Sequence, residues 1–349
     1  MIWIGVDAHK RIHHAVAIDE RGVRGERRIA NTPAAWAELH DWAQQWPERI
    51  WAVEGAWYLG RGLAQYLAVR GEQVHEVSGR ITARRRAGMV RRGKNDRLDA
   101  HAVATVLREE AARLPRVLAE DDDTAAVQLW SRTQAEVTKD LTRLMNRLHD
   151  LLLLCDPEYQ SKLPALTTKA AIERLRAYVA PGSTALARER ELVIRQTAEQ
   201  LALLDAQDRE LRRKLERASR STFRVLREIE GIGALIACGL VAEVGRPRPG
   251  FGEEQLAALA GVSPLEASSA GAMRHRLNRG GNRRLNMLFH QIVLTQGRMY
   301  APAQTYLARR RAEGLTAREA RRALKRLIVR RVYRALCSCF DRSVERVAA

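Results

Sequence analysis

The sequence predicts two kinds of architecture in one chain of 349 residues: an α/β domain with a mixed sheet at the N-terminal end, and all-α structure after it. Three observations support this prediction. Short apolar segments alternate with turn residues over residues 1–80, as in strands and helices that pack together. Long charged segments with leucines at spacings of three, four and seven follow, which is typical of helices. All seven tryptophans lie within the first 130 residues, so the two regions differ in core composition.

The N-terminal region predicts the element order β-β-β-α-β-α-β-α. A helix is expected to begin at Thr32 and Pro33, because threonine is a good cap and proline suits the first helical position. The remaining elements are strands at 2–9, 15–19, 27–30, 49–54 and 73–77, and helices at 60–69 and from about 81. This order predicts a mixed sheet with helices packed against it.

The central region predicts an antiparallel helical hairpin or a coiled coil. Its two leucine stripes are Leu141, Leu144, Leu148, Leu151 and Leu201, Leu204, Leu211, Leu215, with prolines between them. We interpret this region as a spacer or an oligomerisation arm, which predicts a homodimer or tetramer. The acidic cluster at residues 120–123 is interpreted as the cap of the first long helix. The expected domains are residues 1–118, 119–220 and 221–349.

The charge of the chain favours a nucleic-acid partner. Lys and Arg number 60 against 41 Asp and Glu, and only seven of the 60 are lysines. Residues 270–349 alone hold 19 basic and four acidic side chains. Arginine forms a fork that matches phosphate oxygens, and a basic surface of this size usually faces nucleic acid or an anionic membrane.

A membrane partner is the weaker interpretation. The longest apolar runs, residues 151–155 and 235–242, are far shorter than the ~20 residues that a spanning helix needs. The N-terminus has an early Asp7 and no basic segment, so we do not expect a signal peptide. The four cysteines show no CxxC or Cys/His zinc spacing, which indicates ordinary thiols in a reducing cytoplasm.

Four carboxylates lie at the ends of predicted elements. Asp7 ends the first strand and Glu54 ends the fourth, while Asp96 and Asp99 lie three apart where a helix is expected to open. Taken singly, each of these carboxylates is explained equally well as a turn cap, a surface residue or a partner of the helix dipole. Together they form a pattern that favours Mg²⁺, which prefers oxygen ligands. Two such ions ~3.5–4 Å apart suit phosphodiester chemistry.

Two glycine- and serine-containing motifs follow. Gly231 and Gly233 in the segment EGIG resemble a helix-hairpin-helix turn, whose backbone N–H groups reach a DNA phosphate, although a tight interhelical turn fits equally well. Ser268 and Ser269 lie in a small-residue loop that precedes five arginines, Arg274, Arg276, Arg279, Arg283 and Arg284. This loop either presents a serine nucleophile to a phosphodiester or is a flexible phosphate-binding loop.

The C-terminal region predicts an amphipathic basic helix over residues 316–336. Arginines and one lysine cover a broad face, while leucine, isoleucine and valine cover the other. Contact with a nucleic-acid backbone is the expected role, and it is assigned to Arg322, Lys325 and Arg326.

These motifs, in this order, resemble the transposases of the insertion sequence 110 family, the group that includes the Piv-type DNA invertases. The resemblance runs from residue 2 to about residue 336, and it rests on GVDAHK, AVEGAW, KNDRLDA, EGIG, LAALAGVSP, ASSAG and RLNRGGNRRLN. It implies an N-terminal RuvC-like (RNase H-like) domain whose acidic tetrad would be Asp7, Glu54, Asp96 and Asp99. It also implies a central coiled-coil arm and a C-terminal transposase domain with a helix-hairpin-helix-like element.

The resemblance implies the chemistry as well. In the family, a serine five residues after the proline of an AGLxP segment is the nucleophile, which corresponds here to Ser269 after Pro264, with Ser268 as its neighbour. The tetrad would hold Mg²⁺, and the serine would form a reversible phosphoserine link to DNA. A structured bridge RNA would pair with donor and target double-stranded DNA. A bacterial cytoplasmic, nucleoid-associated location follows from these partners.

The sequence departs from the family pattern at three positions. Ala270 stands where a glycine usually follows the serine, Ala56-Trp57 stand where a small Thr-Gly pair is common, and Glu230 stands where a proline often precedes GIG. None of these changes removes a proposed catalytic side chain. The first bears on the choice between the two serines, because glycine permits backbone conformations that alanine does not.

Three hypotheses therefore remain at this point. The first is an RNA-guided DNA recombinase that uses the four acids and Ser269. The second is a RuvC-like junction nuclease that hydrolyses DNA with metal and water. The third is a basic architectural DNA binder without activity. The four acids oppose the third, and the serine loop opposes the second. His9 and His101 lie near the acids and are not assigned to the site.

Overall fold

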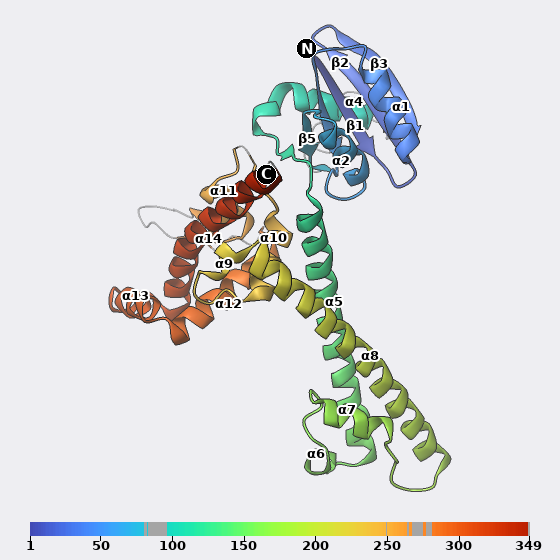
Figure 1. Ribbon diagram of the computed structural model, residues 1–349, viewed down its shortest axis with the longest axis vertical. Coiled ribbons are helices and arrows are strands. Elements are labelled where there is room, and N and C mark those ends of the chain that lie inside the picture. Colours follow the sequence, from blue (N-terminus) through green and yellow to red (C-terminus); the bar gives the residue numbers. More distant parts are fainter. Residues whose placement is uncertain are drawn as a thin grey trace. The chain divides into compact units, whose positions relative to one another are not determined.

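The computed structural model describes most of the chain in two compact units (Figure 1). The first unit contains Met1–Asp121 and Arg246–Gly252, and the second contains Asp122–Gly245 and Glu253–Ala349. The described residues are 1–79, 82, 96–248, 250–263, 265–266, 275–276 and 281–347.

The first unit is built on a mixed six-stranded sheet in the order β3-β2-β1-β4-β5-β6. Strand β1 is parallel to β4, and β4 is parallel to β5, while β2, β3 and β6 each run antiparallel to a neighbour. The strands are β1 (Ile2–Ala8), β2 (Ile12–Asp19), β3 (Gly22–Ala30), β4 (Arg49–Glu54), β5 (Val74–Val77) and β6 (Arg116–Val117). The predicted mixed sheet with helices is therefore confirmed.

The helices of this unit cover both faces of the sheet. They are α1 (Pro33–Ala43), α2 (Arg61–Val69) and α4 (Asp96–Glu110), with a short 3-10 turn at Ala111–Arg113. Thr32 caps α1 by accepting a hydrogen bond from the Ala35 N–H, as the sequence predicts. The predicted helix from about residue 81 falls largely outside the described residues.

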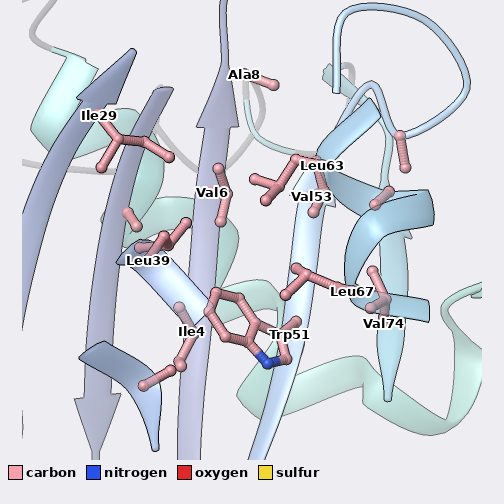
Figure 2. Close-up of a cluster of buried hydrophobic side chains, with 14 of the residues drawn as sticks. Ile4, Val6, Ala8, Ile29, Leu39, Trp51, Val53, Leu63, Leu67 and Val74 are labelled. Carbon is pink, nitrogen blue, oxygen red and sulfur yellow. The ribbon is translucent and has the colours of Figure 1, made fainter. Parts of the chain in front are cut away.

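Alternate side chains of β1 point to opposite faces of the sheet. Ile4, Val6 and Ala8 belong to the core shared with α1 and α2, which also contains Trp51 and Leu63 (Figure 2). Trp3, Gly5 and Asp7 therefore point to the opposite face, because successive side chains of a strand alternate. Trp3 packs there beside two small residues of α4.

Helix α4 lies directly on β1 at Gly5. A Cβ atom on Gly5 would lie 2.2 Å from the Ala104 nitrogen and 2.4 Å from the Ala100 oxygen. No larger residue fits between the two backbones, so this glycine sets how closely the helix approaches the strand.

Two long helices dominate the second unit and run antiparallel, side by side (Figure 1). They are α5 (Asp122–Cys155) and α8 (Ala185–Ser221), and the Gln134 side-chain amide of α5 donates to Asp208 of α8 at 2.9 Å. Near the far end of α5, Leu148 and Leu152 form a core with Ile194 and Leu201 of α8. The short helices α6 (Tyr159–Lys162) and α7 (Lys169–Arg176) complete this core.

The rest of the second unit is mostly helical. Its centre is α10 (Ala234–Val244), in which every residue from Ala237 to Ala242 is buried. The other elements are α9 (Arg224–Arg227), α11 (Glu253–Leu259), β7 (Leu265–Glu266), β8 (His275–Arg276), α12 (Arg283–Met299), α13 (Ala301–Ala312) and α14 (Ala317–Val347). Strands β7 and β8 pair antiparallel. Within the described part of the chain, no helix has the length and apolar character needed to cross a membrane.

We expect Gly5→Ala to destabilise the first unit by about 3 kcal/mol, because the added methyl group would overlap the backbone of α4. Six of the seven tryptophans belong to this unit, so chemical denaturation followed by tryptophan fluorescence measures its free energy of unfolding. The exposed Ala34→Ser in α1 is the control, with a change within ~0.5 kcal/mol. An unchanged free energy of unfolding for Gly5→Ala would show that α4 does not rest on β1.

Candidate active site and nucleic-acid interface

Asp7 and Glu54 lie side by side on neighbouring strands. Strands β1 and β4 are parallel and in register through Val6 and Val53, so the next residue on each is one of the two acids. Both side chains point toward the α4 face, because Gly5 and Ala52 two residues earlier contact that helix or its core. Asp7 is only 6% exposed and Glu54 is half-buried.

Helix α4 places Asp99 on the same face of the sheet. Asp99 precedes Ala100, whose carbonyl oxygen lies against Gly5, and its side chain is 6% exposed. Asp96 is the first residue of α4, and its side chain lies outside the described part of the structure. The fold thus brings three of the four predicted carboxylates to one face of the sheet.

The donor set suits a hard cation, since all four predicted ligands are carboxylates. Among the described side chains, however, there is no group of three or more His, Cys, Asp and Glu residues placed to hold a metal ion. The Asp96 side chain is not among those described. The described acids therefore share a face without forming a closed ligand cluster on their own.

Two histidines lie close to Asp7, and neither was assigned to the site from the sequence. The Nε2 atom of His9 lies 3.0 Å from the Asp7 carboxylate, and His14 on β2 lies directly opposite Asp7. The strand register is the signal that identifies His14. Burial, together with two nearby arginine charges, lowers the pKa of His101, so its neutral form is favoured.

The loop after Glu54 is held by a segment distant in sequence. The Arg248 guanidinium lies 4.4 Å from the centre of the Trp57 ring, in a cation–π contact within the first unit. Burial raises the pKa of the neighbouring Glu76 carboxyl to about 6, while the Arg248 charge opposes that rise. Trp57 stands where the family pattern has a small residue. The contact with Arg248 therefore uses a side chain that the family pattern lacks at this position.

The turn at Gly231 is fixed by α12. The side-chain amide of Gln296 donates to the Glu230 carbonyl at 2.7 Å, and Gln296 is buried. Gly231 has a φ of 83°, and a Cβ there would lie 3.3 Å from the Ile292 oxygen. The positive φ therefore favours glycine at position 231, because other residues rarely adopt it. Gly233 is the residue before the first turn of α10.

The two sides of the serine loop are joined at their base. A Cβ on Gly281 would lie 2.4 Å from the Gly261 nitrogen, and the Asn282 N–H donates to the Leu259 carbonyl at 2.7 Å. The predicted residues Ser268, Ser269, Arg274 and Arg279 lie outside the described residues, as does the side chain of Arg276.

The adjacent arginines 283 and 284 have different surroundings. Arg284 donates to the Glu243 carboxylate at 3.2 Å and to the Ser131 carbonyl at 2.7 Å, and its side chain is 24% exposed. It therefore ties α12 to α10 and α5 inside the second unit. Arg283 is exposed at the start of α12.

The cations of the basic helix α14 also differ in exposure and in their hydrogen-bond partners. Arg322 is exposed to about the same extent as its partner Glu319, at 45%. Lys325 is only 8% exposed and donates to the Asn286 side chain at 3.1 Å, and burial lowers the pKa of its ammonium. Arg326 donates to the Glu253 carbonyl. Of these three predicted contacts, Arg322 is the one most open to a phosphate.

Two family models match the chain. A model described as "Transposase" matches residues 4–157, and one described as "Transposase IS116/IS110/IS902 family" matches residues 223–308. An uncharacterised 44.8 kDa protein of insertion element IS116 from Streptomyces clavuligerus is 28% identical over 376 residues, covering 93% of this chain and 92% of that protein. A probable family 20 transposase from Pseudomonas aeruginosa is 24% identical, covering 78% of this chain and 76% of that protein.

Solved structures of RuvC from Thermus thermophilus are also similar to part of the chain. The complex with a Holliday junction substrate has a TM-score of 0.27 and 13% identity, covering 34% of this chain and 99% of RuvC. The structure titled Thermus thermophilus RuvC has a TM-score of 0.27 and 12% identity, covering 34% of this chain and all of that chain.

We expect Arg284→Ala and Arg283→Ala to differ in their effect on folding stability. Arg284→Ala leaves Glu243 without its cation, so the free energy of unfolding should fall by about 2 kcal/mol. Arg283→Ala should change it by less than ~0.5 kcal/mol. Thermal denaturation followed by circular dichroism measures both. Equal stability losses in the two variants would contradict the assigned surroundings.

Proposed function

The chain belongs to the IS116/IS110/IS902 family of transposases, and we propose that it excises and inserts an insertion-sequence element by serine-dependent strand exchange. The observation that carries this proposal is the placement of Asp7 and Glu54 on neighbouring parallel strands, facing the helix that bears Asp99. Buried carboxylates on one face of a sheet suit metal-dependent phosphodiester chemistry.

In this proposal, Asp7, Glu54, Asp96 and Asp99 would hold two Mg²⁺ ions. When bound, the ions supply charge that stabilises the attacking and leaving oxygens of the DNA strand. The protein supplies the geometry. His9 orients the Asp7 carboxylate through their contact at 3.0 Å. The close packing of α4 on β1 keeps Asp99 on the face of the sheet that the two strand-borne acids share.

Ser269 is the proposed nucleophile, because it lies five residues after Pro264, as the resemblance to the family implies. The Ser269 hydroxyl loses its proton as its Oγ atom forms a bond to the phosphorus, the bond from phosphorus to the departing sugar oxygen breaks, and that oxygen takes up a proton. A free DNA hydroxyl later attacks the phosphoserine and restores Ser269. Because one ester replaces another, the exchange needs no ATP.

The partners in this proposal are double-stranded donor and target DNA and a structured guide RNA. The basic surplus of residues 270–349 supports binding to polyanions, and exposed cations such as Arg283 and Arg322 would contact the backbones. Gly231 and Gly233 would bring the start of α10 to a phosphate. Exposed leucines on α5 and α8, including Leu153, Leu154 and Leu203, support assembly as a dimer or tetramer through these helices.

We expect each of Asp7→Asn, Glu54→Gln and Asp99→Asn to lower excision by about 10³-fold or more, because each removes a charged oxygen ligand. The measurement is amplification across the joined ends of an excised element in cells that carry the gene with its native flanking DNA. The exposed acid variant Glu136→Gln is the control and should excise like wild type. Normal excision by the three acid variants would overturn the metal-site assignment.

We expect Ser269→Ala to abolish both excision and covalent attachment to DNA, while Ser268→Ala retains both. The covalent product is detected by denaturing electrophoresis of purified protein mixed with labelled DNA, guide RNA and Mg²⁺, and EDTA should prevent it. Cleavage by Ser269→Ala without an adduct would favour hydrolysis by a RuvC-like junction nuclease instead. An adduct in Ser269→Ala that disappears in Ser268→Ala would move the nucleophile by one residue.

A further inference from the structure

A groove of about 650 Å³ lies within the second unit, between α8, α10 and α12. We call it the α8–α10 groove. Its lining consists of Arg212, Arg213 and Glu216 of α8, residues 233–236 at the start of α10, and Gln291 of α12. It is separate from the serine loop and from the basic helix α14 in sequence, and none of its described lining residues belongs to α14.

The α8 side of this groove is strongly basic. Residues 209–221 contain six arginines and lysines against two glutamates. The side chains of Arg212 and Arg213 are 48% and 73% exposed, and each is paired with an acid of its own helix. The Arg213–Glu210 pair is exposed on both sides and contributes little energy, so a phosphate oxygen competes well for that guanidinium group. Arg212 donates through its Nε to Asp208, which is only 7% exposed, and this contact holds its guanidinium group at the groove.

Gly233 stands at a position where the fold does not need glycine. Its φ of −85° and ψ of 178° are ordinary for any residue, and a Cβ there would have no atom of the described residues within 4 Å. Gly231, by contrast, needs its positive φ. Gly233 needs neither a positive φ nor the space that a missing Cβ leaves. A glycine of this kind at the edge of a groove is expected where a ligand approaches the backbone closely.

The start of α10 complements the arginines. Gly233 is the cap residue and provides no side-chain hydrogen bond, so it leaves the first backbone N–H groups of α10 open to an anion at the groove. The amide of Gln291 on the third wall adds a neutral donor. Two cations, backbone N–H groups and an amide thus meet in one open groove, together with the Glu216 carboxylate, which accepts hydrogen bonds from Arg220 and Arg227 at 2.7 Å.

We propose that the α8–α10 groove binds the phosphodiester backbone of DNA, with Arg212 and Arg213 as the cationic contacts and Gly233 as the point of closest approach. This inference rests on the proposed function for the choice of DNA. The proposal extends the DNA-binding surface of the C-terminal region onto α8, which belongs to the helical hairpin. The hairpin is thereby a DNA-contacting element as well as a spacer.

The first test replaces Gly233 with two residues that both cap helices. Gly233→Asp and Gly233→Ser should each match or exceed the wild-type melting temperature, because both side chains accept the free N–H groups. Only the aspartate adds negative charge at the groove. Affinity for duplex DNA at 0.1 M salt, measured by fluorescence anisotropy, should fall about tenfold for Gly233→Asp and less than about threefold for Gly233→Ser. Equal affinities for wild type and Gly233→Asp would overturn the proposal.

The second test compares two double variants on the same helix. Arg212→Gln/Arg213→Ala removes two cations that line the groove, and the glutamine amide keeps a hydrogen-bond donor for the buried Asp208. Arg209→Ala/Arg217→Ala removes two exposed cations of α8 that do not line it. The first should lower DNA affinity about tenfold and reduce the slope of log affinity against log salt by about two. The second should change affinity less than about threefold, and equal losses would contradict a localised site.

These measurements separate the groove from the proposed function. Wild-type protein that fails to bind duplex DNA both alone and together with the guide RNA would overturn the proposed function itself. Wild-type binding that no groove variant weakens would overturn only the groove. The same variants are titrated with duplex RNA of matching sequence. A loss confined to RNA would contradict DNA as the occupant of the groove, whereas a loss on DNA supports it.

Discussion

The close approach of α4 to β1 at Gly5 is the contact on which the candidate active site depends. With no side chain at this position, the helix backbone lies against the strand backbone, and Asp99 comes to the face that Asp7 and Glu54 share. A methyl group at Gly5 would move the helix away and separate the helix-borne acid from the two strand-borne acids. The parallel pairing of β1 and β4 then places those two acids side by side near the ends of their strands. The site is thus a consequence of backbone packing before any ligand is considered.

The cations of the second unit fall into two groups, those that join helices inside the unit and those that are exposed. Arg284 and Lys325 lie inside and make hydrogen bonds that join helices, whereas Arg283, Arg213 and Arg322 face outward. A buried cation that loses its partner is costly, so the first group supports folding. The exposed group pairs only weakly with neighbouring acids, which leaves it available for phosphates. Net charge therefore overstates the size of the nucleic-acid interface.

Much of the first unit could be predicted from sequence, because apolar runs, turn residues and the Thr32 cap report local structure directly. Strand β3 was predicted too short, since most of it is exposed and rich in arginine and lacks an apolar period. Strand β6 has two residues and depends on tertiary pairing with β5, so it leaves no local pattern. Composition alone could not distinguish Arg284 from Arg283, or show that Lys325 is buried. The arginines of the α8–α10 groove were missed because α8 as a whole carries nine basic and seven acidic side chains, which conceals the basic segment 209–221.

The most direct test of this account is a titration of the purified chain with Mn²⁺, followed by the electron paramagnetic resonance signal of the free ion. If the acids at the ends of β1 and β4 and on α4 form one metal site, wild type binds about two ions, and Asp7→Asn and Asp99→Asn each lose tight binding while remaining folded. Tight binding that is identical in wild type and both variants would contradict the account, because the metal would then be held elsewhere.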